Sequence, residues 1–323
     1  MKILITGGAG FIGSNYVNEL ITNESMWSEI VVLDSLTYAG NLANLKFALN
    51  DERVKFIKGD IRDENLLNGL MSKIHTVVHF AAESHVDRSI SDPNNFISTN
   101  VLGTASLLKF ALKFNVSKFL HISTDEVYGS ISEGAWTETY PLKPNSPYSA
   151  SKASSDLLAI SYWKTFGLPV LISRCSNNFG PNQHTEKLIP LTITNLLKNK
   201  NIPIYGNGLN SRDWLHVSDH CRAINALLEK GKPGEIYNIG GGTEKTNLDM
   251  VRILIKHLNK NENSIKFVSD RKGHDLRYSV NFEKIQKECG FSPTNNFEDA
   301  IVETVNWYVN NEKWWQKIKK EAK

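Results

Sequence analysis

The sequence predicts an α/β protein in which a doubly wound parallel sheet is followed by a smaller, mixed α/β carboxyl-terminal lobe. Through the first half of the chain, short apolar runs alternate with segments of helical period, which is typical of βαβ units. A glycine-rich turn joins the first apolar run directly to the first helical segment. After Asn177 the alternation breaks, which marks the start of the second lobe.

Six strands are expected in the first half. They cover Lys2–Thr6, Ile30–Asp34, Val54–Lys58, Thr76–Phe80, Phe119–Ser123 and Val170–Arg174. The first intervening helix is expected over Phe11–Thr22. Right-handed crossovers between strands of this kind give a parallel sheet with helices on both faces, and ligands bind at the carboxyl ends of its strands.

Two further helices of the first half have recognisable ends. One is expected over Phe96–Phe114, preceded by Asp92 as a candidate N-cap and by Pro93, which suits the first helical position. The other begins at Pro147 and ends before Gly167, a candidate C-cap.

The second half predicts a smaller lobe laid over the carboxyl ends of the sheet. Residues 177 to 190 are expected to form a loop, because Asn, Gly, Pro and Gln gather there. The later elements are helices over Leu191–Lys198, Val217–Glu229, Asn247–Leu258 and Phe297–Tyr308, a strand over Ile202–Tyr205, and a turn at Gly206–Gly208. Tyr237–Ile239 is expected to return to the sheet as a short strand. We therefore expect one domain over residues 1–176 and a second mainly over 177–323, with segments near 215–240 returning to the first.

The composition excludes several classes of protein. The 323 residues are 41% hydrophobic and 22% charged, which is enough for a sizeable core. The net charge is +3, and the basic residues form no continuous stripe along the chain. The lysine-dense tail Lys317–Lys323 is expected to be a solvated helix end. Nucleic acid is therefore not an expected partner. Cys175, Cys221 and Cys289 are too far apart for a disulfide framework or a zinc site. The apolar start Lys2–Thr6 is too short for a signal peptide or a membrane span, so we expect a cytoplasmic protein.

The run Gly7–Gly13, GGAGFIG, follows the first strand and opens the first helix. Its glycines permit close approach to a pyrophosphate, and the helix N-terminus supplies N–H donors. The second strand ends in Asp34, where a carboxylate binds ribose hydroxyls and repels a 2′-phosphate. This combination predicts a Rossmann domain that binds NAD rather than NADP; a glycine-rich turn beside a surface aspartate is the alternative. Asp60 and Ile61 are candidate adenine contacts, unless Asp60 is only a helix cap, a role that Asp63 could also fill.

Tyr148 and Lys152 lie four residues apart on an expected helix and therefore share one face. A phenol is a poor base at neutral pH, but a nearby ammonium and a positive nicotinamide favour the phenolate and lower its pKa. Lys152 can also hold the nicotinamide ribose, and Thr124 can hydrogen-bond the same substrate oxygen as Tyr148. The pair predicts hydride transfer; a chance Tyr–Lys pair on a surface helix is the alternative.

Asp125 and Glu126 follow Thr124 directly, at the carboxyl end of a central strand. Oxidising an alcohol needs only the Tyr–Lys pair and a nicotinamide, so adjacent carboxyls indicate a second proton-moving step. Once a sugar C4 alcohol has become a ketone, its C5 proton is acidic. One carboxylate can then remove that proton while a neighbouring acid protonates the C6 hydroxyl, and water leaves. Two carboxyls in one site would also push their pKa values apart. A solvated acidic turn is the competing interpretation.

Several stretches of the chain together resemble a known family. They are GGAGFIGS (7–14), DSLTYAGN (34–41), GDI (59–61), FAAESHVDRSI (80–90), STDEVYG (123–129), YSASKA (148–153), RCSNNFGPNQ (174–183), EKLIP (186–190), RDWLHVSDH (212–220) and DRKGHDLRY (270–278). On these stretches the chain resembles the extended short-chain dehydrogenase/reductase superfamily along almost its whole length, and within it the dTDP-glucose 4,6-dehydratase family. An epimerase or decarboxylase of that superfamily would be expected to lack the Asp125–Glu126 pair.

The resemblance implies an NAD-dependent lyase that converts dTDP-glucose to dTDP-4-keto-6-deoxyglucose, a precursor of rhamnose or a rarer deoxysugar. It implies that Asp125 is the general acid at the C6 hydroxyl and that Glu126 is the base at C5. Tyr148 would be the base at the C4 hydroxyl, assisted by Lys152 and Thr124. The cofactor-binding residues expected from the turn and the resemblance together are Gly7, Gly10, Phe11, Ile12, Gly13, Asp34, Ser35, Leu36, Thr37, Asp60, Ile61, Phe80, Ala81, Ala82, Ser84, Thr99, Tyr148, Lys152 and Asn178.

A further group of residues is implied to hold the nucleotide-sugar. It comprises Ser84, Thr124, Asn177, Lys187, Leu188, Pro203, Ile204, Tyr205, Arg212, Asn247, Arg271, His274 and Tyr278. Arg212 and Arg271 suit a diphosphate because a guanidinium fork binds it bidentately. Surface charge pairs are the alternative for these outer residues. His85 and His274 have no further ligands at zinc spacing, so no metal is expected.

The family resemblance also implies a homodimer, formed through the helices that contain Phe96–Phe114 and Ser149–Phe166. The apolar faces of these helices fit a buried core equally well. Two other functions stay open on the sequence: a 4-epimerase or decarboxylase of another sugar nucleotide, and a catalytically silent NAD-binding sensor of redox state. Intact Tyr148, Lys152, Asp125 and Glu126 argue against the sensor.

Overall fold

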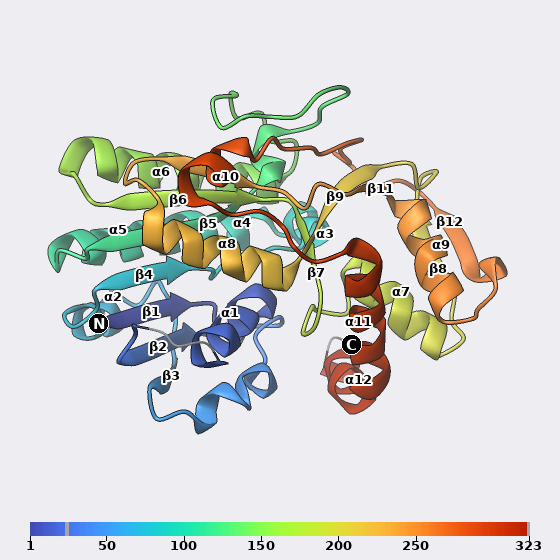
Figure 1. Cartoon of the computed structure of the whole chain (residues 1–323), viewed down its shortest axis with the longest axis horizontal. Helices are drawn as coiled ribbons and strands as arrows, with labels where there is room; N and C mark the ends of the chain where they lie inside the picture. Colours follow the sequence, from blue (N-terminus) through green and yellow to red (C-terminus); the bar gives the residue numbers. More distant parts are fainter. Residues whose placement is uncertain (23–25, 322–323) are drawn as a thin grey trace.

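The computed structural model describes residues 1–22 and 26–321 (Figure 1). It shows a sheet layered between helices and a smaller lobe packed beside it. The lysine-dense tail is helical as far as Glu321, and the expectation for the last two residues of the chain lies outside the described residues. None of the helices in the described part of the chain combines the length and the apolar character that a membrane crossing requires.

Seven parallel strands form the main sheet, in the order β10-β6-β5-β4-β1-β2-β3. Their bounds are β1 (Lys2–Thr6), β2 (Glu29–Asp34), β3 (Val54–Lys58), β4 (Thr76–His79), β5 (Lys118–Thr124), β6 (Val170–Cys175) and β10 (Ile236–Ile239). The six strands expected in the first half are confirmed to within one residue at either end. The strand order reverses direction beside β1, where Thr6 pairs with Leu33 on one side and with His79 on the other. In such a sheet the ligand-binding cleft opens at that point, outside the carboxyl ends of the strands.

Helices cover both faces of the sheet, which confirms the doubly wound class (Figure 1). One face is packed by α1 (Phe11–Thr22), α8 (Val217–Lys230) and α10 (Glu283–Cys289), and the other by α2 (Glu64–Met71), α5 (Gly103–Lys113) and α6 (Pro147–Phe166). Strand side chains alternate between these two cores, so that Ile3 and Ile5 join the first and Leu4 joins the second.

The expected caps are present, but one expected helix is not α-helical along its whole length. Asp92 accepts from the backbone N–H of Asn95, as expected of an N-cap, and Pro93 opens α4 (Pro93–Phe96). A π-helical segment, Ile97–Leu102, joins α4 to α5, so the expected helix over 96–114 is confirmed as helical through Lys113 but is not α-helical throughout. The π turn carries buried Asn100, whose side-chain amide bonds both the N–H and the carbonyl of Glu83, a tertiary contact that helical periodicity cannot reveal.

Helix α6 begins and ends as predicted. Ser146 caps it reciprocally with Ser149, Pro147 occupies the first position, and Gly167 closes it in the left-handed conformation. A short helix α3 (Val86–Ser91) follows β4, and 3₁₀ turns cover Leu42–Leu45, Ala48–Asn50, Asp125–Tyr128 and Glu262–Ser264.

The smaller lobe contains two further small sheets, β11-β9-β7 and β12-β8. Its elements are β7 (Asn177–Phe179), α7 (Leu188–Leu197), β8 (Ile202–Tyr205), β9 (Ser211–His216), β11 (Glu244–Thr246), α9 (Asn247–His257), β12 (Ile265–Val268), α11 (Phe297–Asn310) and α12 (Glu312–Glu321). The expectation of a loop over 177–190 is wrong at both ends: β7 pairs with β9, and α7 starts at Leu188 because Pro190 is tolerated in a first helical turn.

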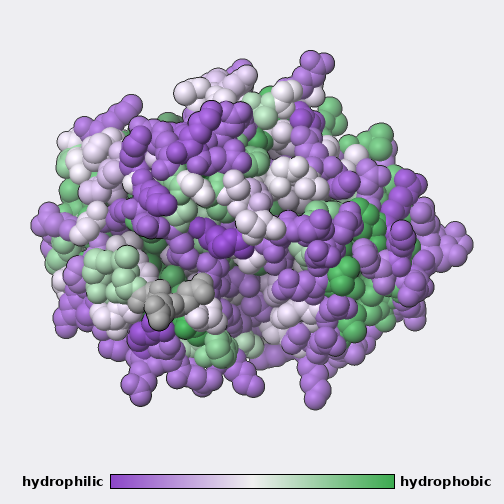
Figure 2. Space-filling model, in the orientation of Figure 1, coloured by the Kyte–Doolittle hydropathy of each residue, from purple (hydrophilic) through white to green (hydrophobic). Residues whose placement is uncertain are grey.

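The chain returns to the main sheet after β9, as expected. Strand β10 pairs in parallel with β6, joining Tyr237 to Ser173, and α8 covers the sheet beside α1. On the face shown in Figure 2, hydrophilic residues predominate, and hydrophobic residues gather mainly over the smaller lobe at the right.

Candidate active site

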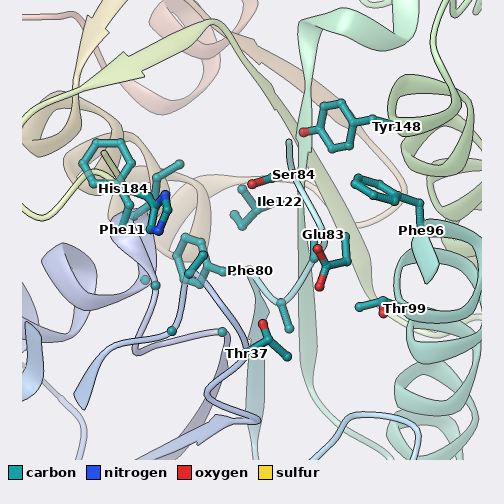
Figure 3. Close-up of a pocket in the computed structure, with 18 of the residues that line it drawn as sticks. Phe11, Thr37, Phe80, Glu83, Ser84, Phe96, Thr99, Ile122, Tyr148 and His184 are labelled. Carbon is teal, nitrogen blue, oxygen red and sulfur yellow. The ribbon is translucent and has the colours of Figure 1, made fainter. Parts of the chain in front are cut away.

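A central cleft of about 580 Å³ opens at the carboxyl ends of the main strands (Figure 3). It is lined by the turns after β1, β2, β3 and β4, by the end of β5, by α6, and by the segment that follows β6. Every predicted cofactor residue lines this cleft except Leu36. The Leu36 side chain instead packs against the core beneath, while its backbone N–H donates to Asp34 at 2.8 Å.

The glycine turn is shaped for close approach. Gly7 has a φ of +70°, and a Cβ there would lie 2.6 Å from the backbone nitrogen of Ala81. A Cβ on Gly13 would lie 2.4 Å from the carbonyl oxygen of Gly7. Asp34 fixes the turn by accepting from the N–H of Ala9 at 2.9 Å. These residues fit a dinucleotide, since the backbone forms a cradle at a helix N-terminus beside a carboxylate.

Asp60 lines the cleft and does not cap a helix. Its carboxylate accepts from Nε of Arg62 at 2.9 Å, and this hydrogen bond lowers the pKa of Asp60. Asp63 is the residue that caps α2, by accepting from two backbone N–H groups. The capping role that competed with an adenine contact at Asp60 is therefore filled by its neighbour.

Asp125 and Glu126 occupy the first turn after β5, where Thr124 caps the 3₁₀ turn by accepting from the N–H of Glu126. The Asp125 side chain is 2% exposed; Oδ1 accepts from Thr124 at 3.2 Å, and Oδ2 has no hydrogen-bond partner among the described residues. Burial, followed by the charges of Glu126 and Asp213, raises the pKa of Asp125 well above its usual range. Burial therefore favours the protonated form of Asp125.

The charged groups around Glu126 differ from those around Asp125. Burial raises its pKa as well, but the charges of Arg271, Lys187 and Arg212 oppose that rise. The two adjacent carboxyls consequently differ in proton affinity: Asp125 holds its proton more tightly, and Glu126 is more readily ionised. Both line the central cleft, which contradicts the interpretation as a solvated turn.

Tyr148 and Lys152 extend from one face of α6 into the same cleft. Nζ of Lys152 donates to the carbonyl oxygen of Ile122 at 2.7 Å. The Tyr148 hydroxyl points into the cleft on the side where Ser84 also points, and its ring meets the ring of Phe96 edge-on at 6.3 Å (Figure 3). Both groups are buried, which contradicts the alternative of a chance pair on a surface helix.

The protein alone does not lower the Tyr148 pKa, so the expected lowering depends on the charge of the nicotinamide. Burial raises the pKa of Tyr148 well above 10, and the charge of Glu126 raises it further, while a hydrogen bond with Thr124 lowers it. Lys152 is itself desolvated, and burial lowers its pKa to about 8. A phenolate at Tyr148 therefore requires more positive charge than the protein supplies.

The residues expected to hold the nucleotide-sugar divide into two groups. Ser84, Thr124, Asn177 and Lys187 line the central cleft. The remaining residues lie outside its lining, and they are Leu188, Pro203, Ile204, Tyr205, Arg212, Asn247, Arg271, His274 and Tyr278. The Ile204 side chain packs in the core of the smaller lobe with Leu196 and Val251, the ordinary place for an apolar strand residue.

Several of these outer residues form a cluster. The guanidinium of Arg212 lies 4.4 Å from the ring centroid of Tyr278 and donates to the carbonyl of Asp275 at 3.0 Å. Tyr205 donates to Asp87 at 3.2 Å, and its ring meets that of His274 edge-on at 6.2 Å. Arg271 comes within 4.0 Å of the same Asp87 carboxylate. The cluster thus joins the smaller lobe to α3 beside the carboxyl pair.

Tyr38, Arg88, His184 and Glu186 are four of the residues that line the cleft but were not predicted as site residues. Three of them lie within the stretches that carry the family resemblance, which was the available signal. Their mutual contacts span up to 146 residues of sequence, between Tyr38 and His184, so no local pattern could predict them. Across residues 1–22 and 26–321, no group of three or more His, Cys, Asp or Glu side chains is arranged to hold a metal ion.

The family described as GDP-mannose 4,6 dehydratase matches this chain over residues 4–304. The chain belongs to this family. Within it, a dTDP-glucose 4,6-dehydratase of Actinoplanes sp. is 53% identical over 319 residues, which cover 98% of this chain and 100% of the relative. A dTDP-glucose 4,6-dehydratase of Streptomyces antibioticus is 52% identical over 99% of this chain and 96% of its own.

Among solved structures, a dehydratase resembles this chain more closely than an epimerase does, in both sequence identity and TM-score. A dTDP-glucose 4,6-dehydratase of Streptomyces venezuelae, solved with NAD bound, superposes with a TM-score of 0.97 at 52% identity, covering 98% of this chain and 100% of that one. A UDP-glucuronic acid 4-epimerase of Bacillus cereus gives a TM-score of 0.91 at 30% identity, covering 96% and 99%. The fold is common to both activities, so the sequence identity and the site residues must separate them.

Proposed function

We propose that this chain is an NAD-dependent dTDP-glucose 4,6-dehydratase, a hydro-lyase that forms dTDP-4-keto-6-deoxyglucose and water. The observation that carries the proposal is the Asp125–Glu126 pair, whose carboxyls differ in proton affinity and lie beside Tyr148 in one cleft. Relatives named for this activity are 52–53% identical over nearly the whole chain. The 4-epimerase or decarboxylase reading is less favoured, because it has no use for the two carboxyls.

The cofactor role falls to the turn Gly7–Gly13, Asp34 and the strand ends around the cleft. Asp34 would hold a ribose, and Asp60 with Ile61 the adenine end. Bound there, NAD would supply the hydride chemistry, with the hydride removed from C4 of the sugar and returned to C6. Its positive nicotinamide also supplies the charge that Tyr148 and Lys152 lack for a phenolate.

The chain's own residues move three protons. Tyr148 accepts the proton of the C4 hydroxyl, while Thr124 orients the oxygen and Lys152 stabilises the phenolate. Glu126 takes the C5 proton, which the C4 ketone has made acidic. Asp125 gives its proton to the C6 hydroxyl, which leaves as water. When the hydride returns to C6, Glu126 gives a proton back to C5, and the proton taken up by Tyr148 replaces the one lost by Asp125. Oxidation at C4 is thereby balanced by reduction at C6, and the net reaction is loss of water alone.

The nucleotide-sugar would lie between the cleft and the smaller lobe. Lys187 lines the cleft, and its charge reaches Glu126 together with those of Arg212 and Arg271. These three cations suit a diphosphate. On this proposal residues 1–176 bind mainly NAD and residues 177–323 mainly the nucleotide-sugar.

We also propose a homodimer through α5, α6 and the adjoining π turn. Leu157 and Phe166 of α6 are 58% and 56% exposed, and Leu102 beside α5 is 57% exposed. Apolar side chains this exposed on neighbouring helices are typical of an interface. A cytoplasmic location is proposed from the three cysteines, all of which are buried free thiols.

The test is incubation with dTDP-glucose in D2O, followed by NMR of the product. We expect a 4-keto-6-deoxy sugar with deuterium at C5, because the C5 proton passes through Glu126 to solvent. A product with no deuterium at C5 would contradict the proposed elimination. A parallel panel of UDP-, CDP- and GDP-glucose measures nucleotide preference, and a galactose or pentose product would support the epimerase or decarboxylase alternative.

A further inference from the structure

Four side chains with no part in the proton steps meet on one wall of the central cleft. We call Tyr38, Arg88, His184 and Glu186 the clasp. They come from three separate segments: the turn after β2, helix α3, and the segment that leads into α7. Figure 3 places His184 on the side of the cleft that carries Phe11 of the phosphate turn.

Arg88 joins the other members of the clasp. Its guanidinium carbon lies 3.8 Å from the ring centroid of Tyr38, and its Nε donates to Oε2 of Glu186 at 3.2 Å. The ring of His184 meets the Tyr38 ring edge-on at 5.4 Å. One cation thereby connects a turn of the Rossmann domain to the entry of the smaller lobe.

The charge of Arg88 has a specific partner. Glu186 is 15% exposed at its side chain, so its carboxylate requires a positive neighbour. His184 lies 3.5 Å from Oε1 of Glu186, but burial lowers the pKa of His184, and burial lowers the pKa of His85 to about 4. Both imidazoles are therefore neutral at neutral pH. Lys187, the other nearby cation, donates instead to the carbonyl of Ser84 at 2.8 Å.

The proposed reaction gives this contact a use. The hydride removed from C4 must return to C6 of the same sugar, so reduced cofactor that escaped halfway would leave the protein unable to finish the turnover. A bridge between the two sides of the cleft opposes that escape. We propose that Arg88, by joining Tyr38 to Glu186, holds the cleft closed over the dinucleotide and slows its release. The inference rests on the proposed function, because it takes the occupant of the cleft to be NAD.

The test is the exchange rate of bound NAD in Arg88→Gln. Protein loaded with NAD is mixed with an excess of isotope-labelled NAD, and the bound fraction is separated by rapid gel filtration and measured by mass spectrometry. We expect exchange to be about tenfold faster than in the wild type, which corresponds to about 1.4 kcal/mol. Glu186→Gln, which keeps the side-chain shape, should accelerate exchange similarly. The double variant should add little to either change, since both substitutions break one contact.

Arg252→Gln is the matched control. Its Nε lies 3.3 Å from Oε2 of Glu262 in the smaller lobe, a pair of similar geometry outside the cleft lining. Exchange in this variant should equal that of the wild type. The melting temperature of each variant shows whether faster exchange comes from loss of the clasp or from loss of the folded structure.

Two results would overturn the proposal. The first is exchange within twofold of the wild type in both Arg88→Gln and Glu186→Gln. The second is unchanged exchange with a raised KM for dTDP-glucose, which would assign these residues to the substrate. Failure of the wild type to retain NAD at all would instead defeat the proposed function, and it is visible before any variant is made.

Discussion

Lys152 donates a hydrogen bond from Nζ to the backbone carbonyl of Ile122 at 2.7 Å, which ties helix α6 to β5 two residues before Thr124. The ammonium is 4% exposed, and burial lowers its pKa from the ordinary 10.5 to about 8. A charge held in so poorly solvated a place destabilises the fold, which indicates that its position serves the chemistry.

Lys152→Met should therefore make the protein more stable and inactive. At pH 7, in protein freed of NAD, we expect the free energy of unfolding to rise by about 1–2 kcal/mol, because removing a desolvated charge outweighs the lost hydrogen bond. Turnover should fall by about 10²–10⁴-fold. Urea unfolding and steady-state assays measure the two effects. Lys164→Met, at an exposed position of the same helix, should change neither.

The same residue predicts a pH dependence of stability. Folded Lys152 loses its proton near pH 8, whereas the unfolded chain keeps it to about 10.5, so the unfolded state binds more protons between these values. Stability conferred at this site must then rise with pH from about 8 toward 10.5. In urea unfolding, the free energy of unfolding of Lys152→Met should exceed that of the wild type by less at pH 9.5 than at pH 7. An equal difference at both pH values would contradict the lowered pKa.

Glu126→Gln should separate oxidation from elimination. The amide cannot accept the C5 proton, so elimination should slow by about 10²–10⁴-fold while Tyr148 still allows oxidation at C4. Reduced cofactor should accumulate on the protein after dTDP-glucose is added, which stopped-flow absorbance measures. Glu133→Gln, at an exposed loop position, is the control and should behave as the wild type. A fully active Glu126→Gln protein would refute the base role.

Asp125→Asn should reshape the pH dependence of turnover. Asp125 must carry a proton to act as an acid, and burial raises its pKa well above the usual range, so its loss of activity occurs on the alkaline side. Glu126 must be ionised, and because burial also raises its pKa, activity falls on the acid side above the ordinary range of a glutamate. We expect Asp125→Asn to lower turnover by about 10²–10⁴-fold and to remove the alkaline limb that Asp125 causes. If the loss of activity at alkaline pH is unchanged in Asp125→Asn, a group other than Asp125 causes it.

The features that sequence predicted well are those set by local chemistry. Gly7 requires a positive φ, Asp34 accepts a hydrogen bond from Ala9 of the glycine turn 25 residues earlier, and the caps Ser146 and Gly167 bound α6. Each leaves a signature within a short window or a fixed spacing. The position of Asp125 followed in turn from the end of β5.

The missed features depend on contacts between distant segments. The π turn of Ile97–Leu102 serves the contact of Asn100 with Glu83, and β7 exists because it pairs with β9. The Arg88–Glu186 contact links residues 98 apart in sequence. The rise of the Tyr148 pKa in the protein alone was also not foreseen, because spacing on a helix says nothing about burial, which is the larger effect there.

A buried polar network lies behind the site. Asp156 and Arg174 are almost fully buried and 2.8 Å apart, and Arg174 also donates to the hydroxyl of Tyr128 at 2.9 Å. That hydroxyl donates in turn to Asn238 of β10 at 2.9 Å. The network therefore connects α6, which carries Tyr148 and Lys152, to two strands of the sheet.

Asp156→Asn should destabilise the protein by about 3–5 kcal/mol, because it leaves the guanidinium of Arg174 buried without a countercharge. The double variant Asp156→Leu with Arg174→Met should recover most of that loss, since apolar groups of similar volume remove both desolvated charges together. Chemical denaturation of the single and double variants measures the coupling. If the double variant is as unstable as the sum of its single changes, the ion pair does not govern this region. Packing around Tyr128, rather than charge, would then hold α6 against the sheet.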